Sequence, residues 1–86
     1  MSSKAEKEFM ALRLHERLAQ VRAHGEYLAT RNHGGHTIHL YRMEGFLCEV
    51  WMRVGFDQVE WIEIPRGTDA LSDYVLFDPK DLLDRP

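Results

Sequence analysis

Three histidines, His33, His36 and His39, stand at the spacing His-x2-His-x2-His. Imidazole nitrogens are common metal ligands, so this run is the first pattern to weigh for chemistry. Side chains alternate between the two faces of a strand, and His36 and His39 are an odd number of residues apart. They would therefore point to opposite faces, while His33 falls in a predicted turn. The spacing predicts no metal site, and no other pair of ligand types has convincing spacing.

Cys48 and His39 could form a thiol–imidazole pair, because they share one face of the predicted hairpin. A cysteine nucleophile needs a partly exposed setting that stabilises the thiolate. The neighbours of Cys48 on that face are Tyr41, Phe46 and Val50. This setting predicts a buried structural cysteine. As the single cysteine of the chain, Cys48 also excludes an intramolecular disulfide and a cysteine-based zinc site.

Three carboxylates, Glu49, Glu60 and Glu63, could carry acid–base chemistry if two of them were paired. In the register predicted below, Glu49 and Glu60 share a face around Trp51. That arrangement could instead frame a small-molecule pocket with an aromatic floor. Isolated charges on a sheet also serve as rim residues that limit wrong strand pairing. We expect no catalytic residue and no cofactor here.

Residues 36–65 are predicted to form an antiparallel meander that positions these side chains. Glu44-Gly45 suits a two-residue hairpin turn, since such turns need positive φ and glycine adopts it readily. The turn fixes the register of the flanking strands. The expected pairs are Met43 with Phe46, Tyr41 with Cys48, His39 with Val50, Thr37 with Met52, Ile38 with Trp51, Leu40 with Glu49, and Arg42 with Leu47.

This register makes both faces of the sheet largely apolar. We expect one to be the core face, formed by Phe46, Cys48, Val50, Met52 and Val54. The next strand, 58–64, would place Val59 and Trp61 on one face and Ile62 and Ile64 on the other. The opposite face then needs cover of its own, with apolar residues Ile38, Leu40, Leu47, Trp51, Ile62 and Ile64.

A helix is predicted from a capping box at Ser3 and Glu6 to about Ala23 or His24, where Gly25 ends it. More than half of its circumference is apolar or small, which favours a partner. Residues 26–31 could extend the helix or form a first strand, and the turn signal at 32–35 favours the strand. In that strand Tyr27 and Ala29 would join the Ile38 face, and Leu28 and Thr30 the core face.

One or two short helices are predicted near the C-terminus, with possible starts at Thr68 or Asp69 and at Asp78-Pro79. The whole chain, residues 1–86, is thus expected to be a single α+β domain of two layers. Its order is an N-terminal helix, an antiparallel meander of three to four strands, and short C-terminal helices.

Charge is distributed unevenly along the chain. Residues 1–43 carry a net +3 and residues 44–86 a net −6, within an overall −3. This asymmetry could steer self-association, or could be solvated surface. The longest apolar runs are too short to span a membrane, the N-terminus is too charged for a signal peptide, and the lone cysteine suits a reducing compartment. We expect a cytoplasmic protein that does not bind membranes.

The layout of helix, strands and helix resembles that of double-stranded-RNA-binding domains. Those domains present a basic second helix to the phosphates, whereas residues 69–84 contain five Asp and one Lys. An acidic segment would repel a phosphate backbone. We therefore expect no nucleic-acid binding.

The leading hypothesis is a small, non-catalytic, self-associating protein, a homodimer with an accessory or scaffolding role. The apolar second face around Trp51 supports it, because large exposed apolar patches are rare on monomers. The alternative is a small-molecule-binding or regulatory module with a pocket around Trp51. The residues expected to carry either role are Ile38, Leu40, Leu47, Glu49, Trp51, Glu60 and Ile62.

Overall fold

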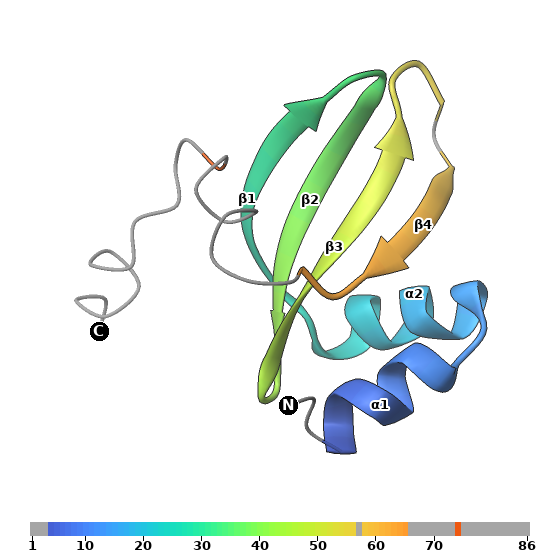
Figure 1. Ribbon diagram of the computed structural model, residues 1–86, viewed down its shortest axis with the longest axis vertical. Helices are drawn as coiled ribbons and strands as arrows, with labels where there is room; N and C mark the ends of the chain where they lie inside the picture. Colours follow the sequence, from blue (N-terminus) through green and yellow to red (C-terminus); the bar gives the residue numbers. More distant parts are fainter. Residues whose placement is uncertain (1–3, 57, 66–73, 75–86) are drawn as a thin grey trace.

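The computed structural model is an α+β arrangement of two helices and a four-stranded antiparallel sheet (Figure 1). It describes residues 4–56, 58–65 and Tyr74. The elements follow the order α1 (Lys4–Ala11), α2 (Leu14–His24), β1 (Glu26–His33), β2 (His36–Met43), β3 (Phe46–Arg53) and β4 (Val59–Glu63). The strands lie in the sheet in chain order, so the sheet is a simple meander. The predicted short C-terminal helices lie outside the described residues.

The β2–β3 hairpin has the predicted turn and the predicted register. Gly45 adopts a φ of 89°, which residues with a side chain rarely adopt. Met43 pairs with Phe46, and the pairing continues without interruption to His36 and Arg53. The expected core-face residues of β3 are accordingly packed on the helix side of the sheet. Val54 is the exception, because it follows the end of β3 and is exposed.

The single N-terminal helix predicted from the sequence is wrong, because the chain breaks it between α1 and α2. Arg13 is extended, with φ −71° and ψ 161°, and precedes the first turn of α2. Its backbone N–H donates to the Glu16 side chain at 2.8 Å, and its carbonyl accepts from the N–H groups of Glu16 and Arg17. A carboxylate three residues into the helix thus satisfies a backbone donor at the break.

The break explains the broad apolar circumference of this region. One straight helix would turn part of it away from the sheet, but two shorter helices each turn their own stripe toward it. Phe9 of α1 and Val21 of α2 are buried in one cluster with Met43, Cys48, Val50 and Ile62. The width of the apolar arc is therefore accounted for within one chain and does not require a partner.

Residues 26–31 belong to a strand, as favoured from the sequence. A bulge at Leu28 shifts the β1 register, so that Tyr27 pairs with Tyr41 and Ala29 with Leu40. Ala29 and Thr30 lie on the predicted faces, but Tyr27 and Leu28 do not. Tyr27 lies on the helix side, and Leu28 packs on the opposite side. One extra residue in a strand exchanges the faces of the residues that precede it.

A second irregularity overturns the predicted faces of β4. Trp61 pairs with Trp51 and Val59 with Met52, which leaves Glu60 as the extra residue. Ile62 pairs with Val50 and is fully buried on the helix side, and Ile64 packs against the same cluster. The prediction that Ile62 and Ile64 share a face with Trp51 is therefore wrong.

The opposite face of the sheet has a smaller core of its own. Ala29, Ile38 and Leu40 are buried there together with Tyr74, and Leu28, Leu47 and Trp51 pack against them. Tyr74 lies far along the chain from the strands that it contacts. The second apolar face is thus covered at its centre by a residue of the same chain.

Candidate functional site

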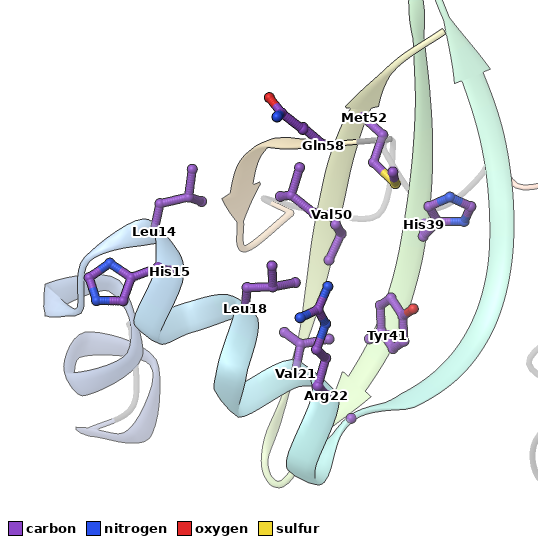
Figure 2. A pocket seen from close by; sticks show the side chains of 12 residues that line it. Leu14, His15, Leu18, Val21, Arg22, His39, Tyr41, Val50, Met52 and Gln58 are labelled. Carbon is purple, nitrogen blue, oxygen red and sulfur yellow. The ribbon is translucent and has the colours of Figure 1, made fainter. Parts of the chain in front are cut away.

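An open groove of about 860 Å³ runs between α2 and the helix side of the sheet (Figure 2). Helix α2 supplies Leu14, Leu18 and Val21, which are spaced to fall on one face of a helix. The strands supply alternate residues of the same sheet face, because side chains on a strand alternate with period two. Helix α2 packs against β2 and β4, and the groove lies between the apolar stripe of α2 and this face of the sheet. Its strand lining comprises His39, Tyr41, Val50, Met52 and Val59.

Three polar side chains lie at the end of the groove nearest the C-terminus of α2. In Figure 2 the Arg22 side chain extends from α2 into the space between Leu18 and Tyr41. Burial raises the pKa of Tyr41, with Tyr27 and Cys48 adding to the rise, while the Arg22 charge opposes it. The phenol of Tyr41 is therefore protonated and available as a hydrogen-bond donor.

His39 is the third polar group of the groove. Burial lowers the pKa of His39, which favours the neutral imidazole. Its Nδ1 lies 3.0 Å from the Thr30 hydroxyl, which holds the ring on the sheet. A neutral, oriented imidazole has one nitrogen that can donate and one that can accept.

Among the described residues that line this groove there is no Asp or Glu. The other members of the lining are His15, Gly25 and Gln58, and His15 lies toward the N-terminal end of α2 (Figure 2). Arg22 has no ion pair with any carboxylate in the described part of the chain. The groove therefore combines an apolar floor with an excess of positive charge at one end.

A buried polar cluster occupies the opposite face of the sheet. Glu49 is 2% exposed, and its Oε2 accepts from Arg31 Nε at 3.2 Å and lies 3.1 Å from Arg31 Nη2. The Tyr74 hydroxyl donates to the same oxygen. Burial raises the pKa of Tyr74, and the Glu49 carboxylate raises it further. These contacts hold Tyr74 and the sheet together, and all three engage the Oε2 atom of Glu49.

Trp51 lies beside this cluster on the same face. The Arg31 guanidinium carbon lies 5.6 Å from the centroid of its ring, and the rings of His33 and His36 meet it edge-on. His36 Nε2 is 2.7 Å from Glu60 Oε1, and Arg53 Nε donates to Glu60 Oε2 at 2.9 Å. Trp51 is thus enclosed by side chains of its own chain on several sides.

Six of the seven residues expected at a site share this face, and the seventh does not. Ile38 and Leu40 are fully buried, Leu47 and Trp51 are half-buried, Glu49 is buried and ion-paired, and Glu60 is exposed. Ile62 lies on the helix side instead, because of the irregularity at Glu60. Glu60 reaches the surroundings of Trp51 through His36, which contacts both residues, and Trp51 is not among the described lining residues of the three grooves that the structure shows here.

Cys48 is fully buried, in keeping with its predicted structural setting. Burial raises the pKa of its thiol to about 12, and Glu49 adds to the rise. A thiol with so high a pKa is almost entirely protonated at neutral pH and is a poor nucleophile.

The two strand histidines leave opposite faces of the sheet, as predicted. His36 contacts Trp51 and Glu60, whereas His39 contacts Thr30 and Tyr27. Within residues 4–56 and 58–65 and at Tyr74, no three His, Cys, Asp or Glu side chains gather at metal-binding distance.

Sequence reasoning missed Arg22 and Tyr74. Arg22 directly follows Val21, which belongs to the apolar stripe of α2. Its position beside this stripe is the one sequence feature that could have indicated Arg22 as a residue of the groove. Tyr74 has no comparable local signal, since its role depends on contact with Glu49, 25 residues earlier.

Comparison of the chain with protein-family models, with curated proteins and with solved structures found no match. In the described part of the chain, neither helix has the length and apolar character needed to cross a membrane.

Proposed function

We propose that this protein is a non-catalytic binding domain whose groove between α2 and the sheet takes a small, largely apolar molecule. The observation that carries the proposal is the groove itself, about 860 Å³ in volume and lined by Leu14, Leu18, Val21, Val50, Met52 and Val59. Small-molecule sites are typically concave and mostly apolar, with a few polar groups that fix orientation. Arg22, His39 and Tyr41 supply such groups here.

The states of the Cys48 thiol and of the Glu49 and Glu60 carboxylates support a non-catalytic role. The Cys48 thiol is buried with a raised pKa, and the Glu49 carboxylate is engaged by Arg31 and Tyr74. Glu60 is exposed at the edge of the sheet, and its carboxylate is engaged by His36 and Arg53. A buried free thiol also suits a reducing compartment, so the proposal places the protein in the cytoplasm.

Titration with a neutral apolar probe, octanol, tests this function by amide chemical-shift mapping. The expected result is a saturable change at Leu18, Val21 and Val50, with no change at Ala29 and Leu47 on the opposite face. A Leu18→Trp variant should fill the groove and weaken the binding, while Leu47→Trp serves as the matched control. Changes centred on Trp51 would instead favour the pocket expected from the sequence, and the absence of any saturable change would contradict the proposal.

Self-association is the second candidate function, and one observation favours it. Three large apolar side chains are exposed on β4 and on the segment that joins it to β3: Val54 is 61% exposed, Phe56 62% and Trp61 43%. Within the described residues β4 pairs only with β3, and an edge strand with apolar neighbours is a surface on which a second copy can dock. Because Ile38 and Leu40 are already buried in one chain, this edge replaces the centre of the opposite face as the proposed contact.

Sedimentation velocity tests the second candidate. We expect a dimer at micromolar concentration that becomes a monomer when Trp61 is changed to Glu. Tyr27→Glu, at the other edge of the sheet, is the matched control and should leave the mass unchanged. A wild-type protein that stays monomeric at high micromolar concentration would contradict a homodimeric accessory or scaffolding role.

A further inference from the structure

We infer that the molecule bound by the groove is an amphipathic organic anion, a medium-chain carboxylate whose head group is held by Arg22 and Tyr41. This inference rests on the proposed binding function and specifies its ligand. It depends on how charge and polarity are arranged along the groove.

The head-group end of the groove is positive, and the described part of its lining supplies no balancing carboxylate. Arg22 and Tyr41 line the same groove, and the Arg22 side chain extends into the space beside Tyr41 (Figure 2), where its charge opposes the rise of the Tyr41 pKa. Arg22 makes no ion pair with the described residues, and no acidic side chain is among the lining residues that the structure describes. A guanidinium presents paired N–H donors that match the two oxygens of a carboxylate.

The donors beside Arg22 are also those that an anion needs. Tyr41 keeps its phenolic proton because burial raises its pKa, so its hydroxyl can donate to an oxygen of the ligand. His39 is neutral and held by Thr30, so it adds a polar contact without a second full charge. One cation with neutral donors suits a single negative charge better than a highly charged phosphate.

The remainder of the groove suits an unbranched apolar chain. From Arg22 to Leu14, helix α2 rises about 12 Å at 1.5 Å per residue. Along this length the helix contributes Val21, Leu18 and Leu14, and the strands contribute Val50 and Met52. A carboxylate at Arg22 would thus leave its hydrocarbon tail against apolar side chains, where burial is favourable.

Isothermal titration of the full chain with three probes of equal chain length tests the inference. The probes are octanoate, octanol and octylammonium, which carry a negative, a neutral and a positive head group. We expect octanoate to bind about tenfold more tightly than octanol, as expected for a hydrogen bond to a charged group, and octylammonium to bind most weakly.

Arg22→Gln should abolish the preference for octanoate and leave the affinity for octanol unchanged. Lys7→Gln removes one positive charge from the exposed side of α1, outside the groove lining, and should retain the preference. Arg22 is exposed, so its substitution is compatible with folding, and a circular dichroism spectrum verifies this.

The outcomes separate the ligand class from the binding function. Equal affinity of the wild type for octanoate and octanol would overturn the anion inference while the groove remains a binding site. No saturable binding of any probe would overturn the proposed function and this inference together. Concentration-dependent shifts of groove amides without any probe would show that a second copy fills the groove, and would overturn both.

Discussion

The hydroxyl of Tyr74 donates a hydrogen bond to the carboxylate of Glu49, and both residues are 2% exposed. The same carboxylate oxygen is paired with Arg31, so one buried acceptor joins β1, β3 and a residue far along the chain. A buried charge is tolerated when its partners satisfy it, and the loss of one partner is costly. This contact therefore stabilises the second face of the sheet.

Tyr74→Phe should lower the free energy of unfolding by about 1–3 kcal/mol, because it removes a hydrogen bond to a buried charged group while retaining the ring. Urea unfolding followed by circular dichroism measures the change. Tyr27→Phe, at an exposed tyrosine, should change stability by less than about 0.5 kcal/mol. Equal losses in the two variants would show that the Tyr74 hydroxyl has no special role.

Arg31→Met should cost about 3–5 kcal/mol, because it leaves the Glu49 charge buried without its cationic partner. Arg42 provides the control, since it pairs with Glu26 between two exposed side chains. Arg42→Met should cost no more than about 1 kcal/mol. The same urea titration compares the two variants. A similar small loss in both would contradict a large contribution of the buried Arg31–Glu49 ion pair to the free energy of unfolding.

Gly45→Ala should destabilise the protein by about 1–2 kcal/mol. A Cβ at Gly45 meets no atom within 4 Å, so the cost arises from the positive φ of 89° alone. A Cβ at Gly35 also meets no atom within 4 Å, and Gly35 does not adopt a positive φ in the left-handed region. Gly35→Ala should therefore be neutral or slightly stabilising. Thermal unfolding of both variants measures the difference, and equal midpoints would argue against strain at the β2–β3 turn.

Alkaline pH should destabilise the fold through Cys48. The thiol has a pKa of about 12 in the folded chain, against an ordinary value of 9.0. Between these values the unfolded chain loses the proton and the folded chain keeps it. The contribution of Cys48 is therefore fully present below pH 9 and is lost as the pH rises toward 12.

Urea unfolding of wild type and Cys48→Ala across this range measures that contribution. The stability of the wild type should fall more steeply with pH than that of the variant. The same burial predicts that iodoacetamide labels Cys48 slowly in the folded protein at neutral pH and quickly in denaturant. Rapid labelling of the folded protein would be incompatible with this account and would reopen a role for the thiol.

The sequence determined the features that depend on neighbours in the chain. A glycine with positive φ after Glu44 set the β2–β3 turn, and the period of two then sorted every residue of that hairpin to its face, including Cys48, Trp51 and the two histidines. The strand at 26–31 was likewise indicated by the turn that follows it. These features need only local backbone preferences and alternation.

Tertiary structure decided the rest, because it depends on packing between distant residues. Three features interrupt a regular helix or strand and thereby allow apolar side chains to pack in a common core: the break at Arg13, the bulge at Leu28 and the irregularity at Glu60. The groove beside Arg22 arises from where α2 crosses the sheet, and the burial of Glu49 depends on Tyr74. Burial free energy among residues far apart in the chain selects these arrangements, and local sequence patterns do not record it.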